Sequence, residues 1–391
     1  MLIQIEKANF PILNGNLFFE GTDQLVWDNP YIILERDDLK IGIIGLHGKF
    51  AFYDTINFKM TEGIEARDEE EYLRKYIKEL KPKTDIIILA VHQGMPGRQS
   101  SIGLTDVERN LYKDILLARN VPGVDIIVTG HAHQGTEKAL VSNGTIIVST
   151  NANATELGKL QIKYDTEKEM IISHSNQLIT IFDDELEDDE EMLREINYWQ
   201  DEVDVIASLP VTSTAEKLVR AYGEESNMGN LFADAIKAFD ERIDIAMVNS
   251  GALRQDIEAG LVTKGDLISA FPFPNTVVIT KLKGSQVKKI FDHAAGMTNG
   301  ILQVSENVKY SFIPGNTAQN IAINGELLSD NQEYWVAAPN FVTQGGDGYL
   351  EFNNSIEYID SGVLVVDATE IFLKDIDIYQ PKYGGRIKVL N

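Results

Sequence analysis

Residues 85–94 of the chain read DIIILAVHQG, an apolar and largely β-branched run that ends in a histidine. Such a run is typical of a strand buried inside a sheet. Residues 124–134 repeat the arrangement as VDIIVTGHAHQ, and here two histidines follow the run. Because α/β proteins place ligands where buried strands end, we expect His92, His131 and His133 to line a crevice at a sheet edge.

The three histidines are candidate metal ligands. A neutral imidazole suits zinc, manganese or iron, and residues i and i+2 of a strand share a face. The spacing of His131 and His133 therefore predicts that both rings enter one crevice. A single histidine in such a place is more often a core or capping residue. Three of only six histidines at strand ends favour a metal site instead.

The composition is that of an acidic globular protein. Its 391 residues, 43% of them hydrophobic, suffice for two domains with real cores. The net charge of -25 opposes binding to nucleic acid polymers and anionic membranes, so a phosphate ligand needs a metal or placed arginines. No apolar run is long enough to span a membrane, and the first residues do not resemble a signal peptide. Without cysteine, disulfides and thiolate ligands are excluded.

The pattern of the chain changes near its middle. The first part alternates strands and helices, as α/β layered domains do. We expect strands at 32–34, 40–44, 85–89, 125–129 and 145–149, and helices at 69–80 and 105–119. The run DDELEDDEE at 183–191 is interpreted as the first turn of a linker helix, where carboxylates oppose the positive helix end. A calcium site is the alternative, but contiguous acids lack the spaced loop and its glycine.

Three segments of the second half are rich in turn residues and flank predicted strands at 243–248, 277–282 and 335–338. They read NSGALR at 249–254, FPFPN at 271–275 and NFVTQGGDGY at 340–349. Each segment alone is explained by an ordinary turn. Together they offer two aromatic faces, an amide, a guanidinium and a carboxylate, the groups needed to hold a base, a sugar and a phosphate.

These motifs resemble the 5′-nucleotidase family, which includes UDP-sugar hydrolases and 2′,3′-cyclic nucleotide phosphodiesterases. The resemblance extends over nearly the whole chain, through FPILNGNL at 10–17, IIGL at 43–46, PGVD at 122–125, NMGNL at 227–231 and GGDGY at 345–349. It implies an α/β protein with a layered αββα metallophosphoesterase-type domain, a linker helix and an α+β nucleotide-recognition domain. We place these parts at 1–182, 183–206 and 207–391.

The resemblance also implies roles for the histidines. His92 is similar to the metal-binding histidine of the family's Ser-His-x-Gly-type segment. His131 and His133 are similar to the ligands of its Gly-His-x-His segment. The implied cofactors are divalent ions, zinc, manganese or magnesium, which the family binds as a pair.

In the second half the resemblance implies a nucleotide site. Phe273 and Phe341 resemble the two aromatics that sandwich the base, and Asn249 resembles the residue that bonds the base edge. Asp347 would accept hydrogen bonds from the ribose hydroxyls, and Arg254 would fork onto phosphate oxygens.

The chain departs from the family pattern in two places. Tyr222 stands where many members have arginine, and Arg220 is nearby but on another side if this segment is helical. The opening Asp-x-His-Gly, bridging Asp and Gly-Asn-His-Asp/Glu motifs do not occur, and the chain begins just after the place of the last of them. The resemblance therefore predicts an N-terminally incomplete domain without identified catalytic residues. Three imidazoles cannot replace the carboxylate that offsets the repulsion between two cations.

Two classes of function remain open at this point. The chain is either a metal-dependent hydrolase of nucleotide phosphoesters or a catalytically inactive remnant that binds nucleosides or nucleotides. A one-metal site with three histidines and water is a third possibility. The resemblance implies a location outside the cell, in the periplasm or at the cell surface, and gives no oligomeric state.

Overall fold

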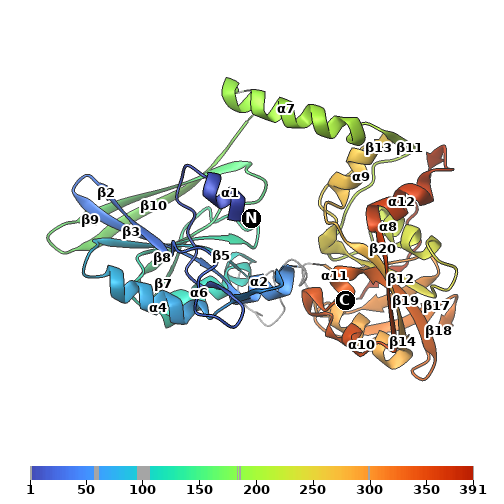
Figure 1. Cartoon of the computed structure of the whole chain (residues 1–391). Helices are drawn as coiled ribbons and strands as arrows, with labels where there is room; N and C mark the ends of the chain where they lie inside the picture. Colours follow the sequence, from blue (N-terminus) through green and yellow to red (C-terminus); the bar gives the residue numbers. More distant parts are fainter. Residues whose placement is uncertain are drawn as a thin grey trace. The chain divides into compact units, whose positions relative to one another are not determined.

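A computed structural model describes residues 2–56, 61–94, 106–182, 184, 186–297 and 300–390. The chain forms two compact units, of which one ends at Glu187 and the other begins at Asp188 (Figure 1). Both units combine helices and sheets. The predicted α/β fold with two domains is therefore confirmed.

The first unit is built on a six-stranded sheet with the order β2-β3-β5-β6-β8-β7. The central strands β3, β5, β6 and β8 are parallel to one another, and β2 and β7 are antiparallel edges. All five strands predicted in this region are present. The bounds are Tyr31–Arg36 for β2, Leu39–His47 for β3, Ile86–Gln93 for β5, Ile126–His131 for β6, Leu140–Ser142 for β7 and Thr145–Val148 for β8.

The helices of this unit agree with the sequence in one case and differ in another. Helix α4 spans Glu69–Leu80 as predicted, and Asp68 caps it by accepting from the backbone N–H of Glu71. The helix expected at 105–119 is divided into α5 (Asp106–Asn110) and α6 (Tyr112–Asn120), while Thr105 lies outside the described residues. The described part of this unit also contains α1 (Leu2–Lys7) and α2 (Lys49–Thr55), and its short strands β1 (Leu17–Phe19) and β4 (Ile64–Ala66) pair with each other.

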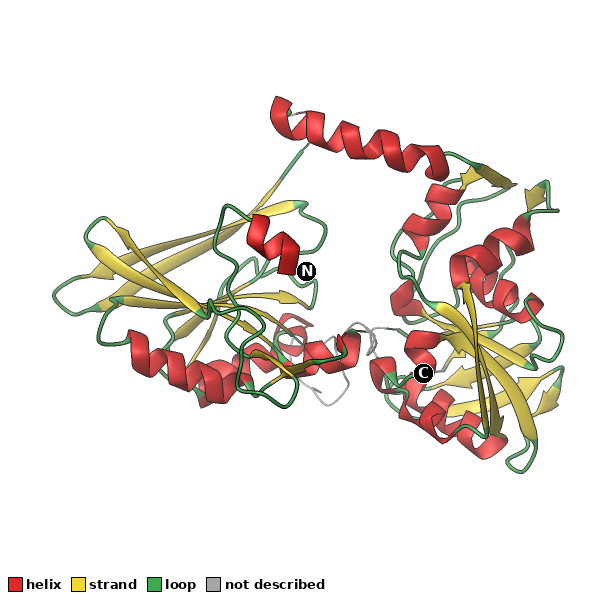
Figure 2. Cartoon of the chain, viewed as in Figure 1, coloured by secondary structure: helices red, strands yellow, loops and turns green. Residues whose placement is uncertain are grey.

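The six-stranded sheet is covered differently on its two faces (Figure 2). Helices α4 and α6 cover one face, where Leu73 and Leu117 share a buried cluster with Ile87 of β5. A long hairpin of β9 (Glu156–Asp165) and β10 (Met170–Thr180) covers the other, and its Leu160 packs against Ile126 of β6. This hairpin was not predicted from the sequence. These layers cover most of the central strands, and the carboxyl ends of β3, β5 and β6 carry His47, His92 and His131.

The second unit opens with the exposed helix α7, Glu190–Ala207. It starts later than expected, because Asp189 is its N-cap and accepts from two backbone N–H groups of the first turn. Only the last residues of the acidic run therefore belong to the helix, and Asp183 and Glu185 lie outside the described residues. No helix in the described part of the chain has the length and apolar character needed to cross a membrane.

A five-stranded sheet with the order β15-β12-β19-β14-β20 forms the centre of the second unit. On β12, Ile245 and Met247 face one buried cluster, and Ala246 and Val248 face another. Helices α8, α9 and α12 contribute to the second cluster, and α10 to the first. The bounds are Ile245–Asn249 for β12, Thr276–Lys283 for β14, Leu302–Val304 for β15, Glu333–Pro339 for β19, Glu357–Leu364 for β20, Asn227–Ala238 for α8, Lys264–Ala270 for α9, Gly284–Ala295 for α10 and Val365–Leu373 for α12.

Two smaller sheets complete this unit. One has the order β13-β11-β21 and the other β18-β17-β16-β22. Their strands are β11 (Pro210–Thr214), β13 (Gly260–Thr263), β16 (Val308–Phe312), β17 (Ala318–Ile323), β18 (Glu326–Leu327), β21 (Ile378–Tyr379) and β22 (Ile387–Val389).

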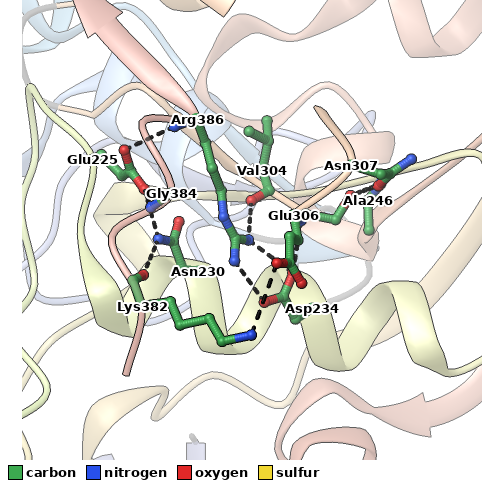
Figure 3. A network of polar contacts seen from close by, with 11 residues as sticks. Glu225, Asn230, Asp234, Ala246, Val304, Glu306, Asn307, Lys382, Gly384 and Arg386 are labelled. Atoms are coloured by element: carbon green, nitrogen blue, oxygen red, sulfur yellow. Dashed lines mark hydrogen bonds and ion pairs between the residues drawn. The ribbon is translucent and has the colours of Figure 1, made fainter. Parts of the chain in front are cut away.

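A buried ion pair fastens the end of the chain to α8 (Figure 3). The Arg386 guanidinium, only 1% exposed, binds both carboxylate oxygens of Asp234 at 2.8 Å. The Glu225 carboxylate accepts from the backbone N–H groups of Gly384 and Arg386 at 2.8 and 2.9 Å. These contacts connect the final strand with the segment that leads into α8.

Candidate functional site

The first candidate site is a group of histidines at the carboxyl edge of the six-stranded sheet. Strands β3, β5 and β6 are parallel neighbours, and their register places His47 beside His92 and Gln93 beside His131. The His92 and His131 rings lie 4.9 Å apart between centroids, and the His47 and His92 rings 5.3 Å apart. Strand order thus gathers side chains from three separate segments of sequence.

One pair of nitrogens in this group has the spacing of shared metal ligands. Nε2 of His92 lies 3.2 Å from Nδ1 of His131. Two nitrogens on one tetrahedral zinc, each about 2.0 to 2.1 Å from the ion, are separated by roughly 3.3 Å. The same spacing also suits an N–H···N hydrogen bond between two neutral imidazoles.

The backbone at the two later histidines is not strand-like. His131 has φ of 82° and His133 has φ of 53°, both in the left-handed region that residues with a Cβ rarely adopt. The two histidines are therefore not residues i and i+2 of one strand, because β6 ends at His131, and the sharing of one crevice stays a prediction. Strained conformations of this kind concentrate at functional sites.

His47 also belongs to this group, although it was not predicted from the sequence. Its strand was expected to end at residue 44, but β3 continues to His47 and places the ring beside His92. The Nδ1 atom lies 3.0 Å from the Gly48 carbonyl oxygen, which can only accept, so Nδ1 carries the proton. Extending the apolar run by three residues to its first histidine would have identified this residue.

The surroundings of His92 and His47 favour the neutral, metal-binding form of each ring. Burial lowers the pKa of His92 below its usual range, and the charges of His47 and His133 lower it further. Burial also lowers the pKa of His47, against smaller opposing effects of the Gly48 carbonyl and Glu69. At neutral pH these rings therefore offer lone pairs rather than positive charge.

The group does not amount to a metal site on its own. Within the described ranges, no three His, Cys, Asp or Glu side chains converge closely enough to hold one ion. His133 is exposed, and the structure does not form a three-histidine site from His92, His131 and His133. His92 and His131 supply two nitrogen ligands and no negative charge, so these residues do not fit the family's pair of cations.

The second candidate site lies at one edge of the five-stranded sheet. Strand β12 runs parallel to β19 and ends at Asn249, and β19 ends just before Asn340. Strand β14 is antiparallel to β19 and begins just after Phe273, with Val277 opposite Pro339. The three turn-rich segments noted in the sequence therefore meet at the same edge, although the third is far from the other two along the chain.

A direct contact joins two of the candidate residues. Nδ2 of Asn249 donates to Oδ2 of Asp347 at 3.0 Å. The carboxylate can only accept, so the amide must turn its nitrogen toward Asp347 and its oxygen away. That oxygen is buried and has no hydrogen-bond partner within the described structure. Asn249, 4% exposed, thus keeps an acceptor available for a ligand N–H group.

A second contact joins Arg254 and Phe273. The Arg254 guanidinium lies over the Phe273 ring, with Cζ 5.3 Å from the ring centroid, which is within the range of a cation–π interaction. Nη1 of Arg220 donates to the Arg254 main-chain carbonyl oxygen, and Nε of Arg220 lies 3.7 Å from Oδ1 of Asp256. The segment around Tyr222 is not helical, so the condition under which Arg220 was expected on another side is not met. Two arginines therefore neighbour each other here.

The backbone of Gly346 packs closely against the Phe341 ring. Helix α11 (Asn340–Thr343) carries Phe341, which packs against the buried cluster under β12 and β19. A Cβ at Gly346 would lie 2.5 Å from Cζ of Phe341, so the turn that carries Asp347 can approach only without a side chain there. The Phe273 ring meets the Phe271 ring edge to face, with centroids 6.3 Å apart.

Comparison with known proteins identifies both units. Residues 8–135 match the calcineurin-like phosphoesterase family, and residues 205–354 match the 5′-nucleotidase C-terminal domain. The chain is 26% identical to the trifunctional nucleotide phosphoesterase protein YfkN of Bacillus subtilis, over 98% of this chain and 28% of that protein. It is 27% identical to protein UshA of Yersinia enterocolitica, over 98% of this chain and 76% of that protein.

A solved structure shows the same fold. The 5′-nucleotidase precursor from Thermus thermophilus superimposes with a TM-score of 0.83 at 22% sequence identity, covering 99% of this chain and 80% of that one. The two family matches occur along the chain in the order that the motifs predict. The chain therefore belongs to the 5′-nucleotidase family, in which a calcineurin-like phosphoesterase domain precedes a 5′-nucleotidase C-terminal domain.

Proposed function

We propose that this protein hydrolyses phosphoester bonds of nucleotides and that its second unit recognises the nucleoside. The observation that carries the proposal is the contact of Asn249 with Asp347 at the sheet edge that also presents Phe273 and Phe341. The aromatic faces and the amide match the flat faces and the polar edge of a base, and the carboxylate matches the ribose diol. The relatives named nucleotide phosphoesterase and 5′-nucleotidase support the same reaction class.

Each residue has a role that follows from its chemistry. The aromatic rings stack on the base, which tolerates any base because all bases have flat π faces. The buried Asn249 oxygen accepts from the base edge. The Asp347 carboxylate accepts from the two ribose hydroxyls, and Arg254 forks onto phosphate oxygens.

Dependence on a divalent metal is part of the proposal because the family is one of metallophosphoesterases. Zinc, manganese or magnesium would supply a bound hydroxide and neutralise charge on the phosphate. His92 and His131 are the two residues whose nitrogens lie close enough to share an ion. Among the described side chains, no third His, Cys, Asp or Glu joins this pair.

A second candidate function is nucleoside or nucleotide binding without hydrolysis. It is favoured by the two-nitrogen histidine pair, which lacks the carboxylate that a pair of cations needs. Both candidates share the nucleotide site of the second unit. A location outside the cell or at its surface remains a prediction from the family.

Phosphate release and ligand binding distinguish the candidates when measured on the same protein. The substrates are AMP, UDP-glucose and 2′,3′-cyclic AMP, each with manganese, zinc or magnesium and again with EDTA. We expect metal-dependent release that His131→Ala abolishes, together with calorimetric binding of adenosine. Adenosine binding without release under any condition would support the binding protein, and absence of both binding and release would contradict both candidates.

A further inference from the structure

The segment that carries Asp347 is an unusual turn. Gly345, Asp347 and Gly348 all have left-handed backbone conformations, with φ of 91°, 52° and 81°. Glycine adopts this conformation at no cost, whereas a residue with a Cβ keeps it only where its surroundings hold it. Asp347 is thus the residue in this turn whose conformation needs support from outside.

That support comes from helix α10. Nε2 of His293 lies 2.8 Å from the main-chain carbonyl oxygen of Asp347. Because a carbonyl only accepts, the Nε2 atom carries the proton and donates it. His293 is near the end of α10, 54 residues before its partner in sequence, and is partly buried.

The imidazole itself is held in a fixed orientation. Its ring meets the Tyr349 ring edge to face, with centroids 4.7 Å apart and an interplanar angle of 79°. Tyr349 is 1% exposed and belongs to the buried cluster on this side of the sheet. The Nε2 donor therefore points at the Asp347 carbonyl from a rigid part of the core.

Asp347 is consequently bound from two sides. His293 fixes its main chain from α10, and Asn249 fixes its carboxylate from the end of β12. The carboxylate position depends on both contacts, because rotation of the turn about the carbonyl would carry the side chain away from Asn249. Gly346 ties the same turn to Phe341, since a Cβ there would overlap that ring.

We propose that His293 is a positioning residue of the nucleoside site: by donating to the Asp347 carbonyl, it holds the left-handed turn so that the carboxylate meets the ribose diol. This inference rests on the proposed function, since it takes Asp347 as the ribose-binding residue. His293 itself touches no part of the nucleotide. Its effect is therefore specific to the ligand hydroxyls and does not extend to base stacking.

Discrimination between adenosine and 2′-deoxyadenosine tests the proposal. The second ligand keeps the base and lacks one hydroxyl that the carboxylate would accept from. Calorimetric titration of the full chain should show adenosine binding about ten-fold or more tightly than 2′-deoxyadenosine, as expected for a hydrogen bond to a charged group. In His293→Leu the ratio should fall close to one, because adenosine loses both hydroxyl contacts whereas 2′-deoxyadenosine loses only the contact of its 3′-hydroxyl and weakens less.

Two conservative variants separate positioning from general support. His293→Gln places an amide N–H near the original Nε2 and should restore most of the ratio. His293→Asn is polar but too short to reach the carbonyl, so its ratio of adenosine to 2′-deoxyadenosine affinity should fall close to one. This variant also provides the test if the leucine variant does not fold. An unchanged ratio in His293→Asn, or equal weakening of both ligands, would overturn the proposal for His293. Absence of discrimination in the unmodified chain would instead overturn the assignment of Asp347.

Discussion

The two candidate sites are supported to different degrees by the rest of the fold. In the first unit, His131 and His133 follow the end of β6 in strained conformations, and His92 and His131 contact each other directly. In the second unit, polar groups of the proposed nucleotide site are fixed by partners from other elements, as Asp347 is by Asn249 and His293. This difference accords with the proposal that the second unit recognises the nucleoside, whereas among the described residues the histidines alone do not form a metal centre.

The largest expected effect concerns the ion pair that anchors the end of the second unit. Arg386→Leu leaves the Asp234 carboxylate without its bidentate partner in a largely buried place. Loss of one partner of a buried pair costs about 3 to 5 kcal/mol. We expect the urea midpoint of the second unit, followed by amide exchange in α8, to fall accordingly.

An exposed ion pair provides the matched control. Lys217→Met removes a contact with Glu258 at the surface, and solvent screening makes such pairs weak. Its midpoint should stay close to that of the unmodified chain. An equal fall of the urea midpoint in both variants would show that the Arg386 ion pair does not stabilise the second unit.

The first unit contains a buried acid that should make its stability depend on pH. Asp114 of α6 is fully buried. Burial raises the pKa of Asp114 to about 7, against a smaller opposing effect of the Thr129 hydroxyl. The folded state therefore keeps the proton while the unfolded state releases it above its ordinary pKa of 3.8.

Stability of the first unit should accordingly fall as the pH rises from about 4 to about 7, since the unfolded state then binds fewer protons. The loss amounts to at most about 4 kcal/mol for a pKa raised to this extent. Asp114→Asn cannot ionise and should remove the fall. Its free energy of unfolding should therefore exceed that of the unmodified chain at pH 8 and match it near pH 4. The measurement is the free energy of unfolding of the first unit, from urea titrations at several pH values. An equal fall with pH in both proteins would show that Asp114 is not the cause.

How far the sequence predicts the molecule differs between the same two regions. Buried parallel strands such as β5 are evident from continuous apolar runs, and helix α4 from its period and its cap. The hairpin of β9 and β10 was missed because only one of its faces is buried, through residues such as Leu160. Its apolar pattern is correspondingly weak, and a partner layer can be identified only after the sheet exists.

The sites show the same limit. The residues Asn249 and Asp347 were identified from the sequence, but their contact depends on strand order across β12, β19 and β14. His47 was missed because the strand before it was ended three residues too early, and His293 because its contact with the Asp347 carbonyl joins residues distant in sequence. Motifs thus identified the candidate site residues, whereas their contacts with residues distant in sequence became evident only from the fold.

A smaller effect would sharpen the assignment of the phosphate contact. Arg254→Met should weaken AMP about ten-fold, because one charge-assisted contact to phosphate is lost. Adenosine should change less than about two-fold, since it has no phosphate and the methionine still covers Phe273. Calorimetry with both ligands measures the difference. Equal weakening of AMP and adenosine would show that Arg254 acts through Phe273 rather than through phosphate.

The central claim is that the second unit recognises nucleosides independently of the histidines of the first. Adenosine titrated into the full chain, His92→Ala/His131→Ala and Phe341→Ala tests it most directly. The account predicts that the histidine variant binds adenosine as the unmodified chain does, within about two-fold, whereas Phe341→Ala loses about ten-fold or more through lost stacking. Loss of adenosine binding in the histidine variant, with binding retained in Phe341→Ala, would contradict the account.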